Sequence, residues 1–97
     1  MVINKISIKQ TEELLKEISE ESIRFKIFQE ELESININLK DIESELNLGR
    51  ISRKLYREFK SLLEKERKAS EAKIKDTKEK ILVKIGKVNK ILTDSKL

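Results

Sequence analysis

The sequence predicts an all-α fold, a long antiparallel two-helix hairpin of the coiled-coil kind, and three observations predict it. The 97 residues contain no proline and two glycines, so neither half of the chain carries a strong helix breaker. Apolar residues of the first half recur at alternating steps of three and four, which is typical of a coiled coil. With 41% charged residues the chain has too few apolar side chains for a large globular core, but its regular pattern is not that of disorder.

The first helix is expected over residues 9–47, after an N-terminal arm over residues 1–8. Its heptads place six residues at position a, namely Thr11, Ile18, Phe25, Leu32, Leu39 and Leu46. Position d is taken by Leu14, Glu21, Phe28, Ile35 and Ile42, with Glu21 as the polar intruder. Capping patterns at Ser7 and at Thr11 place the start of this helix between those two residues.

A turn is expected over residues 48–51, almost at the midpoint of the chain. Asn47 and Gly49 suit a left-handed helix C-terminus, and Ser52 suits the N-cap of a following helix. These residues predict that the chain folds back on itself there.

The second helix is expected over residues 52–93, followed by a short C-terminal tail. Its expected seam repeats every eleven residues and consists of Phe59, Leu63, Glu66, Ser70, Ile74, Thr77, Ile81, Ile85, Val88 and Leu92. An eleven-residue period favours a straight or slightly right-handed path, unlike the heptads of the first helix. All 97 residues are thereby assigned to one helical-hairpin domain.

If the hairpin closes at Gly49, residues that face each other have numbers summing to roughly 98. Ile18 then meets Ile81, and the bulky Phe28 faces small residues, Ala69, Ser70 and Ala72. The same register brings Glu17 towards Lys80 and Lys84. Charge supports the pairing, since residues 1–48 carry a net charge of −5 and residues 49–97 carry +9.

Apolar residues outside the seam predict a second interface, because a two-helix seam does not cover them. We expect these residues to bind a partner: Leu15, Ile23, Ile27, Ile37, Tyr56, Leu62, Leu82 and Ile91. A homodimer that forms a four-helix bundle is the simplest closed assembly. A hetero-oligomer with another helical protein is the alternative assembly. The sequence therefore favours a coiled-coil assembly or adaptor protein.

The basic second helix suggests an alternative function, binding of nucleic acid. The expected contacts to phosphates or other anions are Arg50, Arg53, Lys54, Arg57, Lys80, Lys84 and Lys87. Residues 80–92 also combine an apolar face with a lysine face, which predicts peripheral contact with an anionic membrane as a further alternative.

Composition argues against an enzyme. Histidine and cysteine are absent, which excludes imidazole or thiolate metal sites and the Ser–His and Cys–His nucleophilic pairs. No cofactor is expected, and the glutamates of the first helix lie at solvent-facing positions. The longest apolar run is Ile81-Leu82-Val83, so we expect neither a signal peptide nor a membrane span and place the protein in the cytoplasm.

The segment from Ile42 to Leu63, followed by residues 71–75 with the basic Lys73 and Lys75, resembles the hairpin of subunits in the ESCRT adaptor complexes. In those families a helix ends at a Gly-basic-Ile step, Ser or Pro caps the next helix, and an aromatic residue packs back on the turn. The matching positions here are Gly49, Arg50, Ile51, Ser52 and Tyr56. The resemblance covers residues 42–75 and implies a scaffold subunit of membrane-remodelling machinery.

Overall fold

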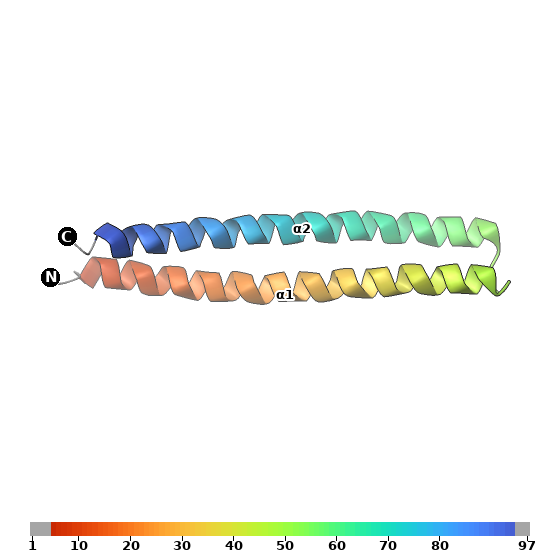
Figure 1. The fold of residues 1–97 in the computed structure, drawn as a ribbon, viewed down its shortest axis with the longest axis horizontal. Helices are drawn as coiled ribbons and strands as arrows, with labels where there is room; N and C mark the ends of the chain where they lie inside the picture. Colours follow the sequence, from red (N-terminus) through yellow and green to blue (C-terminus); the bar gives the residue numbers. More distant parts are fainter. Residues whose placement is uncertain (1–4, 95–97) are drawn as a thin grey trace. The chain divides into compact units, whose positions relative to one another are not determined.

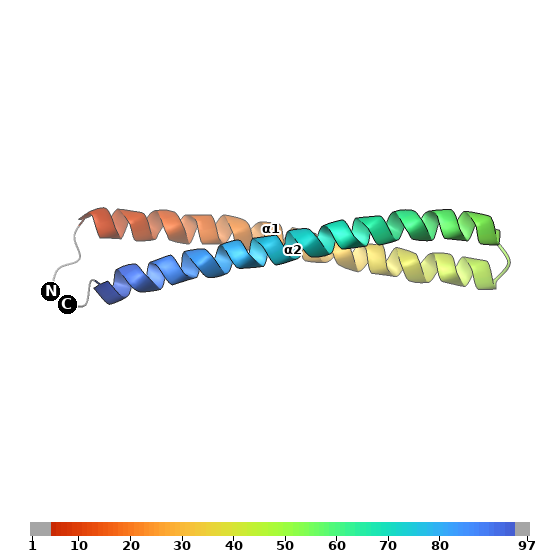
Figure 2. The ribbon, with the colours of Figure 1, turned by 90° about the horizontal axis from the view of Figure 1, so that it is seen from above.

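The computed structural model describes residues 5–94, and side chains from residue 8 to residue 94. It confirms the all-α antiparallel hairpin: α1 spans Lys5–Asn47 and α2 spans Arg53–Asp94 (Figure 1). The chain divides into two compact units. In unit 1, residues 5–26 of α1 lie antiparallel to residues 75–94 of α2, and unit 2 holds residues 27–74 with the turn (Figure 1 and Figure 2).

The heptad seam of α1 is confirmed. Its less exposed apolar positions are those predicted from spacing, from Leu14 to Leu46, and Glu21 is buried among them. The predicted start of the helix between Ser7 and Thr11 is wrong, because α1 already begins at Lys5. Nothing in residues 5–10 breaks a helix, and Thr11 lies within the seam and not at an N-cap. Residues 1–4 of the expected arm lie outside the described part of the chain.

The turn has the local chemistry that its sequence predicts. Gly49 has a left-handed backbone with a φ of 73°. Its N–H donates to the carbonyl of Leu46 at 3.0 Å, and the N–H of Arg50 donates to the carbonyl of Glu45 at 2.9 Å. These two bonds form a Schellman motif, in which an ion pair of 3.3 Å between Arg50 and Glu45 takes the place of the usual apolar contact.

Ser52 caps the second helix as expected. Its Oγ accepts a hydrogen bond from the N–H of Leu55 at 3.1 Å, and its carbonyl accepts from the N–H of Tyr56 at 2.9 Å. The helix proper begins one residue later, at Arg53, and ends at Asp94.

The same substitution at the two glycines is expected to have opposite effects. Gly49→Ala should lower the free energy of unfolding by about 1 kcal/mol, because a Cβ disfavours a left-handed backbone. Gly86→Ala should raise it by about 0.5 to 1 kcal/mol, since position 86 is helical and a Cβ there meets open space. Urea unfolding followed by circular dichroism measures both changes. A loss of stability in both variants would contradict this account.

The predicted eleven-residue period of α2 is wrong, because its less exposed residues follow heptads. Those at positions a and d are Tyr56, Leu63, Arg67, Ser70, Ile74, Thr77, Ile81, Lys84, Val88 and Ile91, and Glu64 beside Leu63 is the one further residue of α2 that is not exposed. Phe59, Glu66, Ile85 and Leu92 were expected in this seam but are exposed. Two helices that share one seam must keep a common period, so α2 adopts that of α1. Arg67 and Lys84 fit because their long aliphatic stems pack in the seam. The Nζ of Lys84 lies 3.7 Å from Glu17 and Glu21, and the Nε of Arg67 is buried 3.8 Å from Glu71.

The register of the hairpin also differs from the prediction by about one helical turn. In unit 1, Lys84 reaches Glu17 and Glu21, and in unit 2 the Nζ of Lys73 lies 5.5 Å above the ring centre of Phe28. The numbers in these pairs sum to 101–105, and not to 98. The reason is that residues 48–52 all lie outside the helices, which moves the centre of the hairpin beyond Gly49. The predicted pair of Lys84 and Glu17 is present, whereas Lys80 pairs with Asp76 on its own helix at 3.2 Å.

The seam is thin. Of the apolar side chains that the structure describes, Ile35 and Val88 alone are buried, with 8% and 7% exposure. Glu21, Ser70 and Thr77 are the buried polar residues in that range. A hairpin of two helices therefore leaves most of its apolar side chains in partial contact with water.

Candidate protein-interaction surface

A polar cluster crosses the seam of unit 1. The buried carboxylate of Glu21 accepts a hydrogen bond from Arg24 at 2.8 Å on the same helix. From α2, the Nζ of Lys84 lies 3.7 Å from Glu21 and 3.7 Å from Glu17. Lys84 thus contacts two carboxylates that lie one turn apart on α1.

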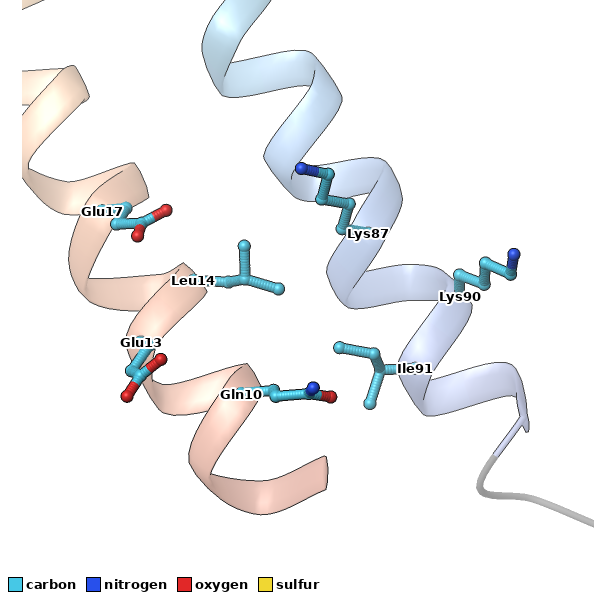
Figure 3. A pocket seen from close by; sticks show the side chains of 7 residues that line it. All are labelled: Gln10, Glu13, Leu14, Glu17, Lys87, Lys90 and Ile91. Atoms are coloured by element: carbon cyan, nitrogen blue, oxygen red, sulfur yellow. The ribbon is translucent and has the colours of Figure 1, made fainter. Parts of the chain in front are cut away.

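One side of unit 1 is polar. Next to the seam lies a shallow groove of about 370 Å³, lined by Gln10, Glu13, Leu14, Glu17, Lys87, Lys90 and Ile91. Leu14 and Ile91 point towards each other across it, whereas Lys90 points away from α1 (Figure 3). Gln10, Glu17 and Lys87 occupy heptad position g, and g positions face each other in an antiparallel pair. Acidic and basic groups thus flank the seam on this side.

On the other side of unit 1, four of the six described e positions are apolar, and the other two hold Ser22 and Lys78. There the heptads place Ile8 and Leu15 of α1, and Ile85 and Leu92 of α2, at position e, and each pair is seven residues apart. These four side chains, which we name the apolar flank, are between 39% and 52% exposed. Position e of one helix lies beside position e of the other in an antiparallel pair. The apolar flank therefore widens the seam of unit 1 into an exposed hydrophobic face.

The described e positions of unit 2 do not form an exposed hydrophobic face. They hold polar or charged residues on both helices: Gln29, Asn36 and Glu43 on α1, and Arg57, Glu64 and Glu71 on α2. The apolar residues at the edge of unit 2 are scattered, as for Ile37 and Leu62, or lie near the turn, as for Leu48, Leu55 and Phe59.

The structure separates the eight residues expected to bind a partner into two groups. Six are exposed, and they are Leu15, Ile23, Ile27, Ile37, Leu62 and Leu82. Tyr56 and Ile91 are half-buried in the seam instead. Ile8, Ile85 and Leu92 were missed as surface residues, because Ile85 and Leu92 had been assigned to the seam of α2. A heptad count along α2 places both at position e and would have found them.

The seven basic residues expected to bind anions differ in their surroundings. Arg50, Lys80 and Lys84 are engaged in ion pairs with Glu45, Asp76 and the Glu17–Glu21 pair. Arg53, Lys54, Arg57 and Lys87 are exposed. Arg53 and Lys54 lie in the first turn of α2, whose positive dipole end disfavours cations.

Neither helix, over the described residues, has a stretch long and apolar enough to cross a membrane. Within the same residues, no three acidic side chains converge as ligands for a metal ion. Comparison of the chain with protein-family models, with curated proteins and with solved structures finds no match.

Proposed function

We propose that this chain is a non-enzymatic assembly or adaptor protein that binds helical proteins through apolar side chains left exposed by its own hairpin. The observation that carries this proposal is the number of large apolar residues outside the seam, on both helices and in both units. Full transfer of one such side chain from water into an apolar contact is favourable by about 1.5 to 3 kcal/mol, before the entropic cost of association. Isolated exposed apolar residues are common on protein surfaces, but the four of the apolar flank share one face.

A variant with six lysines tests this proposal. Lysine replaces every exposed member of the predicted partner-binding set: Leu15, Ile23, Ile27, Ile37, Leu62 and Leu82. We expect the wild type to self-associate in light scattering and to retain helical proteins from an extract of the native host. We expect this variant to stay helical but to do neither. The physical reason is that a lysine at each site puts a charge where a partner would bury an apolar group.

A charge-matched control separates lost contacts from added charge. It carries lysine at six exposed polar positions of the same helices, namely Ser19, Gln29, Ser34, Asn38, Ser61 and Asn89. We expect this control to behave as the wild type does. If the wild type, the control and the six-lysine variant share one mass and retain the same proteins, the proposed function is wrong.

Nucleic-acid binding is the second candidate, and the first turn of α2 favours it. Arg53 and Lys54 are exposed where the helix dipole opposes a positive charge, so they do not serve the stability of the helix. Phosphate groups would relieve that repulsion. A mobility-shift titration with duplex DNA and RNA at rising salt tests this candidate, because phosphate contacts weaken steeply with salt. Absence of binding at low salt would exclude it.

The resemblance of residues 42–75 to ESCRT adaptor hairpins suggests where a partner should be sought. We propose membrane-remodelling machinery as that setting, with a helical subunit as the partner. The matching residues lie at the turn, where Gly49 and Ser52 have the conformation and the capping bond that such a hairpin needs.

A further inference from the structure

We infer that the apolar flank of unit 1 is the contact surface for a second copy of this chain, with α1 of each copy lying over α2 of the other. The inference rests on the proposed function and names the partner and the face. It concerns Ile8, Leu15, Ile85 and Leu92, all of which the hairpin leaves exposed.

The first argument is the width of the apolar stripe. Two helices that pair only with each other need apolar residues at positions a and d, whereas a helix in the core of a bundle also needs them at e or g. Both helices of unit 1 have this wider pattern, since each carries two apolar residues at e. Unit 2 has the narrower pattern, with polar residues at its described e positions, so the widened apolar stripe lies in unit 1.

The second argument is that the apolar flank is complementary to itself. α1 and α2 both present large aliphatic side chains seven residues apart, Ile8 with Leu15 and Ile85 with Leu92. Two copies related by a two-fold axis therefore bring equally spaced ridges together, and the same residues are buried in both copies. A second hairpin supplies two more helices and closes a four-helix bundle.

Charge selects the arrangement of the two copies. Residues 12–21 of α1 hold five glutamates and one lysine, a net charge of −4, and residues 78–90 of α2 hold five lysines and one glutamate, a net charge of +4. If α1 lay over α1 and α2 over α2, like charges would face each other. With α1 over α2 of the other copy, opposite charges meet, which fixes the register of association.

The test uses two charged variants of the full chain, Leu15→Glu and Ile85→Lys, with mass measured by light scattering. The wild type is expected at twice its chain mass of 11.4 kDa, and each variant alone at 11.4 kDa with its helicity kept. An equimolar mixture of the two variants is expected to return to the double mass. In the mixed pair the new carboxylate on α1 of one copy faces the new ammonium on α2 of the other.

Control variants in unit 2 carry the same changes, Ile37→Glu and Leu62→Lys, and are expected to keep the double mass. A wild type at 11.4 kDa over all concentrations would overturn the inference, and so would a Leu15→Glu variant that keeps the double mass. A mixture that stays at 11.4 kDa would overturn the arrangement of α1 over α2. If the six-lysine variant loses its partners while Leu15→Glu keeps the double mass, the inference fails and the proposed function stands.

Discussion

Replacing Ile35 with alanine is expected to lower the free energy of unfolding by about 2 to 3 kcal/mol. Ile35 is one of the two buried apolar residues of the described chain, at position d of unit 2. It lines a groove of about 410 Å³ together with Ala69 and Ser70 of α2. Truncation removes its apolar contacts, and small neighbours cannot fill the space, so the loss falls within the range of about 2 to 5 kcal/mol known for buried isoleucine.

Ile37 provides a matched control, because the same change occurs two residues along the same helix. Its side chain is 51% exposed, so Ile37→Ala is expected to change stability by less than about 1 kcal/mol. The midpoints of urea unfolding, followed by circular dichroism, compare the two variants. Equal midpoints would show that Ile35 does not hold the seam of unit 2.

The second large effect concerns the polar cluster of unit 1. Replacing both Glu21 and Lys84 with leucine is expected to raise the free energy of unfolding by about 1 to 4 kcal/mol. Glu21 is buried at position d of α1, and Lys84 lies 3.7 Å away at position d of α2. Removing both charges from the seam ends the cost of desolvating them and adds apolar contacts.

One single variant and one double control complete the experiment. Lys84→Leu leaves the buried carboxylate of Glu21 with Arg24 alone, so it should be less stable than the double variant by more than about 1 kcal/mol. The exposed pair of Asp76 and Lys80 is the control, and replacing both with leucine should change stability by less than about 1 kcal/mol. If the leucine pair at 21 and 84 destabilises the protein, the cluster stabilises the fold more than it costs.

The sequence predicts α1 and the turn well because both depend on local features. Every a and d position from Thr11 to Leu46 is confirmed as a less exposed position, since apolar residues at heptad spacing line one face of a helix. The left-handed Gly49 and the capping Ser52 are confirmed for a similar reason. Their preferences arise within a few residues of the chain.

The start of α1 is less well determined by local signals. Ser7 and Thr11 each resemble an N-cap, but helix continues through both of them. A capping preference of about 1 kcal/mol is outweighed when the preceding residues also form helix and extend the packed seam.

The all-α hairpin, the seam of α1 and the chemistry of the turn can be predicted from residue spacing and short-range preferences alone. The face of α2 that packs depends instead on its contacts with α1. Apolar residues stand beside one another along α2, as with Ile91 and Leu92, so its pattern fits two different stripes. The heptads of α1 select one of them, place Lys84 in the seam and leave Ile85 and Leu92 outside it. The apolar flank therefore exists because two helices in one seam must share one period.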